Sequence, residues 1–408
     1  MAGVACAVGR EAVPPAKRME YTGSAPMRIL FVTKYYPPEE GGIERYGHML
    51  CSDLAARGID VEVVAASGTA RRGYRQEVVD GVKVHRLGCQ FSISSAPVTL
   101  RLPGLLHEIA KDFDLLHLNS PNPWADILHM AICGDRKTIL TYHADIYRPP
   151  GSVGGMLLKA YKPLIHRLLN GVAGIIATSP TYIDSSPFLQ RQREKARVIP
   201  MPVDMAIFAD ADADAVAHAV ARFGTFVLFV GRLVAYKGLP VLIDAVDRVA
   251  GIRLVIAGRG PLEGELQRQV AARGLGDRVH FTGKISDEEL KNLYHACLCF
   301  ALPSISRAEA FGIVMAEAMS CGKPVISTDL DTGTTYVNKD GVTGFVVPPH
   351  DPEALAAKLQ LLLEDGEACR HLGERARQRV AEKFDKPIVV AETLRLYEEV
   401  LAGGTGAA

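Results

Sequence analysis

Residues 307–324, RAEAFGIVMAEAMSCGKP, follow a short apolar run and carry the most informative pattern in the chain. The stretch predicts a strand, a loop and then a helix that Gly322 ends. Gly312 permits close approach of a ligand, because it has no side chain. The free backbone N–H groups of Gly312, Ile313 and Val314 then form an anion site at the helix N-terminus.

Two carboxylates, Glu309 and Glu317, lie eight residues apart in this stretch. If the helix were continuous through both, they would share one face about 12 Å apart at 1.5 Å per residue. That separation suits the opposite ends of a sugar diphosphate. The alternative is a pair of solvated carboxylates that flank an ordinary helix start.

The same alternation of strand, loop and helix extends outward in both directions, which is typical of parallel sheets covered on both faces. In the first half the expected strands lie at 28–33, 61–65, 82–86, 115–118, 138–141 and 174–177, with the first helix over 43–57. In the second half they lie at 225–230, 253–257, 279–282, 298–302 and 324–327, with a helix from Gly238 onward.

These elements predict an α/β protein of two tandem Rossmann-like, doubly wound domains over residues 27–203 and 204–386. Residues 1–26 lack a basic start and predict a disordered leader, not a signal peptide. Residues 387–408 predict a C-terminal helix that can fold back on the first domain. Ligands of such folds sit beyond the carboxyl ends of the strands, so the loops there carry the chemistry.

The bulk composition narrows the functional classes. Of the 408 residues, 48% are hydrophobic and 23% are charged, and no apolar run is long enough to span a bilayer. The net charge is zero, yet residues 1–200 carry 24 Lys/Arg against 18 Asp/Glu, whereas residues 201–408 carry 22 against 28. The two halves are therefore expected to meet different partners. Nucleic-acid binding is not expected, because there is no basic stripe with interleaved aromatic residues.

Neither the cysteines nor the aspartates predict a metal site. The eight cysteines show no paired framework, and Cys297 and Cys299, on one side of an expected strand, are expected to be core thiols in a reducing cytoplasm. Asp329 and Asp331 form a D-x-D pair, for which we expect a solvated loop. The alternating aspartates around Asp212 predict a linker or a helix start.

A basic loop, Gly231–Gly238, directly follows the first strand of the second half. Its cations, Arg232 and Lys237, lie where a strand turns into a helix, so they can clamp phosphate oxygens as charge builds on a leaving group. The alternative is an ordinary solvated basic loop.

Other strand-end loops carry weaker signals. Gly41 and Gly42 lie between the first strand and the first helix, where glycines let a backbone approach phosphate. His143 ends another strand of the same domain, and a single histidine there is more often a structural residue. Two further loops follow successive strands of the second half and contain Gly258, Lys284 and Ile285.

The stretch from Glu309 to Glu317, with its Phe-Gly-Ile turn, is similar to the E-x7-E signature of glycosyltransferase family 4. The resemblance runs from about Met27 to near the C-terminus. It implies a GT-B fold, with two domains facing across a cleft, and transfer of a sugar with retention of configuration. It further implies that Glu309 bonds the donor sugar, that Glu317 binds the ribose hydroxyls and that the amides of Phe311, Gly312, Ile313 and Val314 hold the diphosphate.

The resemblance also implies roles for the other loops. Gly231–Gly238 is similar to the family's G-R-x(4)-K-G loop, in which both cations bind the donor diphosphate. Gly41 and Gly42 resemble a loop that faces the donor phosphates from across the cleft, and His143 resembles the histidine that bonds the donor sugar near the reacting carbon. The loops with Gly258, Lys284 and Ile285 resemble those that contact the nucleobase.

Catalysis is therefore expected without a metal ion or a protein nucleophile. Arg232, Lys237 and the helix N-terminus at Gly312 would stabilise the charge on the departing diphosphate, while Glu309 and His143 order the sugar. In a same-face route the leaving phosphate deprotonates the acceptor. Two alternatives remain: a GT-B sugar-nucleotide epimerase or phosphorylase, and a non-catalytic nucleotide-sugar-binding subunit.

One loop departs from the family's common pattern. Many members carry a Gly-Gly-x-x-Glu loop where this chain has residues 332–337, TGTTYV. That loop resembles members that transfer mannose or deoxyhexoses in bacterial surface-polysaccharide assembly. It favours a guanosine diphosphate donor over a uridine diphosphate donor.

The acceptor is expected to be a glycan or a lipid-linked sugar. Residues 156–169 place Lys159, Lys162 and Arg167 among apolar residues, so the segment can lie on an anionic membrane surface on the inner face of the plasma membrane. The alternative is an amphipathic helix packed on its own sheet.

Overall fold

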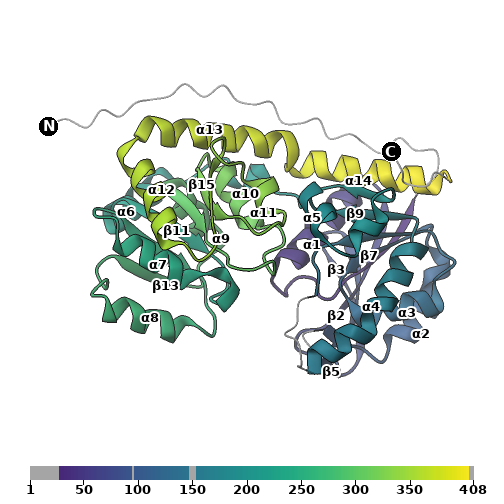
Figure 1. The fold of residues 1–408 in the computed structure, drawn as a ribbon. Coiled ribbons are helices and arrows are strands. Elements are labelled where there is room, and N and C mark those ends of the chain that lie inside the picture. The colour runs from purple at the N-terminus through teal and green to yellow at the C-terminus, as the bar shows by residue number, and fades with distance from the viewer. Residues whose placement is uncertain (1–26, 94–95, 147–152, 404–408) are drawn as a thin grey trace.

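The computed structural model describes residues 27–93, 96–146 and 153–403. They form two lobes that lie side by side, each built on its own sheet (Figure 1). The two Rossmann-like α/β units expected from the sequence are confirmed. The predicted leader, residues 1–26, lies outside the described residues, as do residues 404–408 at the end of the predicted C-terminal segment.

The N-terminal sheet has eight strands in the order β10-β9-β8-β7-β1-β2-β4-β3, and all its pairings are parallel except that of β3 with β4. Its strands are β1 (Arg28–Val32), β2 (Asp60–Ala66), β3 (Tyr74–Val79), β4 (Val82–Leu87), β7 (Leu115–Ser120), β8 (Thr138–Tyr142), β9 (Gly174–Ala177) and β10 (Ala196–Val198). A hairpin of β5 (Phe91–Ile93) and β6 (Ala96–Val98) lies apart from this sheet.

The C-terminal sheet is wholly parallel, in the order β13-β12-β11-β14-β15-β16. Its strands are β11 (Phe226–Val230), β12 (Arg253–Ala257), β13 (Val279–Gly283), β14 (Cys299–Leu302), β15 (Val325–Thr328) and β16 (Gly344–Val347). The strand order reverses between β11 and β14, and a reversal of this kind opens a crevice at the carboxyl ends of the strands.

Helices connect the strands in both lobes. The N-terminal lobe has α1 (Gly42–Ala56), α2 (Leu102–Ile109), α3 (Pro123–Ile132), α4 (Val153–Gly171) and α5 (Pro180–Ser185). The C-terminal lobe has α6 (Ala213–Phe223), α7 (Leu239–Asp247), α8 (Glu263–Ala272), α9 (Asp287–Ala296), α10 (Ile313–Ser320), α11 (Thr334–Val337), α12 (Pro352–Glu364) and α13 (Gly366–Lys383). Within the described ranges, no helix is both long and apolar enough to cross a membrane.

The last helix, α14 (Lys386–Leu401), continues from α13 and runs along the N-terminal lobe (Figure 1). Its Tyr397 hydroxyl lies 2.5 Å from Nδ1 of His117 on β7, and its Glu399 pairs with Arg197 of β10 at 2.9 Å. Just before α14, the Val203 amide donates to the Phe384 carbonyl at 2.8 Å. The two ends of the second lobe therefore meet beside each other, where the chain passes between lobes.

Each strand expected from the sequence is present, because central parallel strands are apolar on both faces. The four residues from Phe226 to Phe229 on β11, for example, are fully buried. The predicted first helix, 43–57, lies one residue from the observed α1. The sequence did not indicate β3, which is an exposed edge strand, or the three- and four-residue strands β5, β6, β10 and β16.

The helix that carries Glu317 begins at Ile313, because Gly312 has φ 75° and ψ 55°, outside the right-handed helical region, so Glu309 does not lie on the same helix. One local prediction was wrong: Cys297 is not on a strand with Cys299, since it caps the end of α9. Both thiols are nevertheless buried and free, as expected for core cysteines.

Candidate functional site

The N-terminus of α10 lies at the carboxyl end of β14, beside the point where the strand order reverses. Gly312 caps it in a left-handed conformation, and a Cβ there would lie 2.8 Å from Leu302 and 2.7 Å from Met315. Glycine is therefore required for the turn that points the first N–H groups of α10, at Ile313 and Val314, out of the helix. The Phe311 ring packs on Phe384 in the core, so only its backbone is available to a ligand.

The Gly-Gly loop of the N-terminal lobe faces this helix end. Gly41 and Gly42 are exposed, and a Cβ on Gly42 would lie 3.9 Å from the Ile313 side chain. The tertiary structure thus brings together two loops separated by some 270 residues in sequence, both of which the sequence marked as phosphate loops.

The basic loop after β11 contributes a buried ion pair. Lys237 Nζ lies 2.5 Å from Glu309 Oε2, which also accepts from the Ser304 hydroxyl at 3.0 Å. Burial lowers the pKa of Lys237 more than any other single cause, but the charge of Glu309, the hydrogen bond to it and Tyr236 together outweigh burial, and the pKa is raised. Gly238, with φ 68°, fixes the turn, because a Cβ there would lie 2.0 Å from the Pro303 carbonyl. Arg232, from the same loop, is exposed.

Glu317 is 2% exposed and is held by one residue from each lobe. Arg45 Nη1 of α1 donates to its Oε1 at 2.9 Å, and the Tyr294 hydroxyl of α9 donates to its Oε2 at 2.9 Å. Burial raises the pKa of Glu317, while Arg45 and the hydrogen bond from Tyr294 oppose that rise. No pattern in the sequence pointed to Arg45, because nothing along the chain links it to a residue 272 positions away.

His143 follows β8 and is 4% exposed. Its Nε2 lies 3.0 Å from Asn119 Oδ1, and its ring meets that of Tyr46 edge-on at 4.9 Å between centroids. Burial, with the charge of Lys34, lowers the pKa of His143 to about 3, so the ring is neutral at physiological pH. Among the described residues its buried Nδ1 meets no hydrogen-bond partner, which leaves it available to a ligand hydroxyl.

The loops after β12 and β13 also lie at this end of the C-terminal sheet. Gly258, with φ 144°, is held against the backbone of the β11 loop, since a Cβ there would lie 2.0 Å from the Gly231 carbonyl. Lys284 is exposed and pairs with Glu40, next to the Gly-Gly loop, at 2.9 Å. Ile285 is partly buried against the core.

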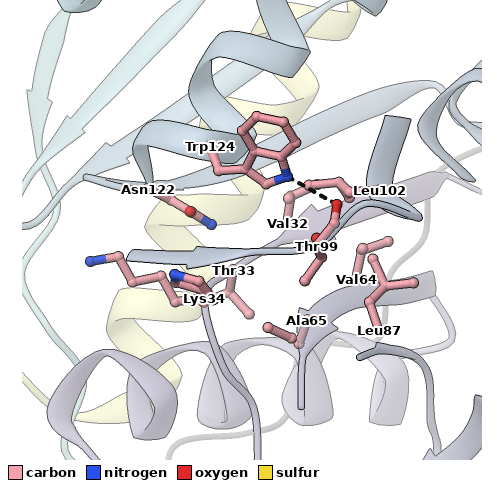
Figure 2. Close-up of a pocket in the computed structure, with 12 residues that line it drawn as sticks. Val32, Thr33, Lys34, Val64, Ala65, Leu87, Thr99, Leu102, Asn122 and Trp124 are labelled. Carbon is pink, nitrogen blue, oxygen red and sulfur yellow. Dashed lines mark hydrogen bonds between the residues drawn. The ribbon is translucent and has the colours of Figure 1, made fainter. Parts of the chain in front are cut away.

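A recess of about 10 Å³, roughly the room that one water molecule needs, lies at the carboxyl ends of β1 and β2 in the N-terminal lobe (Figure 2). Lys34, Asn122 and Trp124 line it, together with apolar side chains such as Leu102. The Trp124 indole is fixed by a 3.0 Å hydrogen bond to the Thr99 carbonyl. The Oδ1 atom of Asn122 is buried with no hydrogen-bond partner in the described part of the chain. Sequence reasoning missed this recess, although Lys34 directly follows a predicted strand.

The aspartates noted in the sequence lie in an exposed loop and at a helix N-terminus. Asp329 and Asp331 are exposed in the loop after β15, which is the solvated loop pair expected from the sequence. Asp212 caps α6 by accepting from the amides of Asp214 and Ala215. Over the ranges that the structure describes, no three His, Cys, Asp or Glu side chains gather in a way that could hold a metal ion.

Two facing Rossmann-like lobes, with cations and a helix N-terminus at the strand ends between them, define a GT-B glycosyltransferase, a class that takes its sugar from a nucleotide-sugar donor. Residues 212–379 match the family described as “Glycosyl transferases group 1”, and residues 40–207 match “Glycosyltransferase Family 4”. The chain belongs to glycosyltransferase family 4.

Similar proteins extend over nearly the whole chain. O-antigen chain mannosyltransferase C of Escherichia coli is 36% identical over 92% of this chain and 99% of its own length. D-rhamnosyltransferase WbpZ of Pseudomonas aeruginosa is 36% identical over 88% of this chain and 92% of its own. Among solved structures, Anabaena HepE in complex with UDP has a TM-score of 0.72 at 21% identity, covering 91% of this chain and 100% of HepE.

Proposed function

We propose that this enzyme transfers a mannosyl or deoxyhexosyl unit from a guanosine diphosphate sugar to a hydroxyl of a glycan or lipid-linked acceptor, with retention of configuration and without a metal ion. The sugar is supported by the TGTTYV loop at residues 332–337 and by relatives named for mannosyl and rhamnosyl transfer. The guanine base rests on the same loop resemblance. Assembly of a bacterial surface polysaccharide in the cytoplasm is the setting that these relatives suggest.

The observation that carries the proposal is the buried Lys237–Glu309 pair, at 2.5 Å, close to the α10 N-terminus. Cleavage of a sugar–phosphate bond builds negative charge on the leaving diphosphate. A cation already oriented by a buried carboxylate, with the helix N–H groups and Arg232, can stabilise that charge with little rearrangement. Glu309, held by Lys237 and Ser304 through Oε2, keeps Oε1 for a sugar hydroxyl.

His143 is proposed to order the reacting end of the sugar through its neutral ring. Since the oxygen of Asn119 accepts from Nε2, the neutral ring carries its proton on Nε2. The Nδ1 atom is then an acceptor for a sugar hydroxyl. Retention then follows from a route in which the leaving phosphate oxygen takes the proton of the acceptor hydroxyl on the same face. The atoms balance without a protein nucleophile, because the acceptor oxygen gains the sugar carbon and the phosphate gains the proton.

Peripheral attachment to an anionic membrane is a separate proposal. One face of α4 packs into the N-terminal core through Ile165, Leu168 and Leu169. For that face, the alternative of an amphipathic helix packed on its own sheet applies. The other face exposes Met156 and Leu157 by 62% and 48%, and it also exposes Lys159 and Lys162. Apolar side chains beside cations are the combination that binds anionic lipid surfaces.

The membrane proposal is tested by flotation with phosphatidylglycerol vesicles. Loss of binding on Lys159→Ala/Lys162→Ala/Arg167→Ala, with no loss on Arg370→Ala/Arg375→Ala/Arg377→Ala of α13, would support it. Equal binding by the wild type and both variants would contradict the membrane proposal.

The transfer proposal is tested by incubating the purified enzyme with guanosine, uridine and adenosine diphosphate sugars, a hydroxyl acceptor, and either a chelator or Mg²⁺. We expect turnover with GDP-mannose or a GDP-deoxyhexose, unaffected by the chelator, and a product whose anomeric configuration by NMR matches that of the donor. Inversion would contradict the same-face route, and a chelator-sensitive rate would contradict metal independence.

A further inference from the structure

The contact between Arg45 and Glu317 joins the two lobes inside the proposed nucleotide site. Arg45 lies in the first turn of α1, directly after the Gly-Gly loop, and its Nη1 donates to Glu317 Oε1 at 2.9 Å. The Arg45 side chain is 33% exposed, whereas that of Glu317 is 3% exposed. The carboxylate is therefore enclosed, and its cation reaches it from the other lobe.

A buried carboxylate is costly unless a cation or hydrogen-bond donors compensate its charge. The ionisable groups that act on Glu317 are Arg45 from α1, Tyr294 and Asp287 from α9, and Cys321 at the end of α10. Of these four, Arg45 is the cation. Asp287 opposes ionisation of Glu317, and burial does so more strongly. Arg45 is thus the charge that balances the carboxylate.

The number of hydrogen bonds that Glu317 can accept matches a ribose. An ionised carboxylate has about four acceptor positions, two on each oxygen. Arg45 occupies one on Oε1 and Tyr294 occupies one on Oε2, which leaves one position on each oxygen. The two neighbouring hydroxyls of a ribose would fill those positions. A protonated Glu317 would instead present an O–H donor on one oxygen and lose this match.

We propose that Arg45 is a positioning residue of the nucleotide site, which holds Glu317 in place and keeps it an acceptor for both ribose hydroxyls. The inference rests on the proposed role of Glu317 in donor binding. It means that nucleotide affinity depends on the N-terminal lobe, although the E-x7-E residues belong to the C-terminal one. The Gly-Gly loop lies close to the same site, since a Cβ built on Gly42 would lie 3.9 Å from the Ile313 side chain.

The experiment is calorimetric titration of the full chain with guanosine, uridine and adenosine diphosphates at pH 6, 7 and 8. Arg45→Met removes the charge and keeps the length of the side chain, and Arg45→Lys keeps the charge. Glu40→Gln is the matched control, because it breaks another ion pair between the lobes, Lys284–Glu40, without touching Glu317. Circular dichroism verifies that each variant is folded.

For the nucleotide that binds the wild type, we expect Arg45→Met to weaken affinity about tenfold at pH 8 and about tenfold further at pH 6, because the unbalanced Glu317 takes up a proton as the pH falls. The wild type, Arg45→Lys and Glu40→Gln should change less than about threefold across this range. The 2′-deoxy analogue should bind wild type more weakly than the ribonucleotide, and this difference should disappear in Arg45→Met at pH 6.

A pH profile of Arg45→Met parallel to that of the wild type would overturn the inference and leave the proposed function intact. Binding of no nucleoside diphosphate by the wild type would overturn both. If Arg45→Met does not fold, two other measurements test the inference: the preference of the wild type for the ribonucleotide, and the pH profile of nucleotide affinity in Arg45→Lys. An affinity of Arg45→Lys that falls steadily with pH would contradict the role of the charge.

Discussion

Both glutamates of the E-x7-E stretch are paired with a cation, and the two pairs differ in origin. Lys237 and Glu309 belong to the same lobe and are both buried, whereas Glu317 is paired with Arg45 of the other lobe. Buried ion pairs add little to stability, since desolvation offsets their attraction. Two such pairs at the strand ends of one crevice are therefore better explained by ligand binding than by folding.

If Lys237 stabilises the leaving diphosphate as proposed, its replacement by Met should lower kcat about 100- to 1000-fold. It should also destabilise the fold by about 3–5 kcal/mol, because Glu309 is left buried and unpaired. Donor turnover and urea unfolding measure the two effects.

The double variant Lys237→Met/Glu309→Met separates the effect of the Lys237 charge on turnover from its effect on stability. It should regain most of the stability, because no buried charge is left, but none of the turnover. Arg370→Met, which breaks an exposed pair with Glu374 on α13, is the control and should change kcat less than about twofold. A double variant that recovers turnover would refute the electrostatic role.

The low pKa of His143 gives a second prediction at this scale. Since burial and Lys34 lower that pKa to about 3, the ring stays neutral as the pH falls through 6.5, where an exposed histidine gains a proton. We expect kcat to show no step attributable to His143 between pH 5 and 8. His143→Phe should lower kcat at every pH in that range by a constant factor. A step near pH 6.5 in the wild type that this variant abolishes would contradict a neutral ring.

At the scale of elements, the site consists of helix and strand ends. The turn before α10 depends on one left-handed glycine, Gly312, which ends the loop from β14 and starts the helix. The amides of the first turn can then face an anion, because no earlier carbonyl accepts from them within the helix. A change in this turn affects the direction of the helix end as well as local stability.

Gly312→Ala tests the turn, with Gly341→Ala as a matched control. Both glycines have positive φ, 75° and 67°, so each alanine should cost about 1–2 kcal/mol. Only at Gly312 would the new Cβ meet neighbours, at 2.7–2.8 Å, while Gly341 has open space. We expect Gly312→Ala alone to weaken nucleoside diphosphate binding about tenfold, as measured by thermal shift. An equal effect of both variants on binding would show that α10 does not hold the phosphate.

At the scale of the whole molecule, α14 ties the C-terminal end of the chain to the N-terminal sheet. The Tyr397 hydroxyl contacts Nδ1 of His117, whose Nε2 lies 2.7 Å from the Thr141 hydroxyl two residues before His143. This places a polar network in the N-terminal core, where burial lowers the pKa of His117 to about 3. The network makes overall stability dependent on pH.

Stability should fall as the pH drops from 7.5 to 5.5. The pKa values of His117 and His143, about 3, and of His129, about 4, lie below the unfolded value of about 6.5, so the unfolded chain binds more protons in this range. Asp126, whose pKa burial raises to about 6, acts in the opposite direction, as do other buried carboxyls. We expect a net loss of about 1–3 kcal/mol, seen as a lower thermal midpoint.

His129→Gln should reduce this loss by about 1 kcal/mol, because it removes one of the three buried histidines whose pKa in the folded chain lies well below the unfolded value. The exposed His371 provides the control, and His371→Gln should leave the slope unchanged. A midpoint that rises on acidification would mean that the buried carboxyls outweigh the histidines.

The alternation of strands and helices, the two α/β units and the family could all be predicted from the sequence. The reason is local. Central parallel strands are apolar along their whole length, and the E-x7-E and G-R-x(4)-K-G residues are close together in sequence. The sequence also marked Lys237, Glu309 and Gly312, since each sits where a strand gives way to a helix. Short and exposed edge strands such as β3 carried no comparable pattern.

Which of these residues come into contact depends on the folded arrangement of the two lobes and their loops. Arg45 and Glu317 are 272 residues apart, and the Lys237–Glu309 pair joins two different strand-end loops. Hydrophobic periodicity indicates which face of an element is buried. The pairing of charges depends instead on which loops meet at the end of one sheet, as for Lys237 and Glu309, or on how the two lobes are placed against each other, as for Arg45 and Glu317. The neutral state of His143 likewise follows from burial between β7, α1 and its own strand end, an environment assembled only by folding.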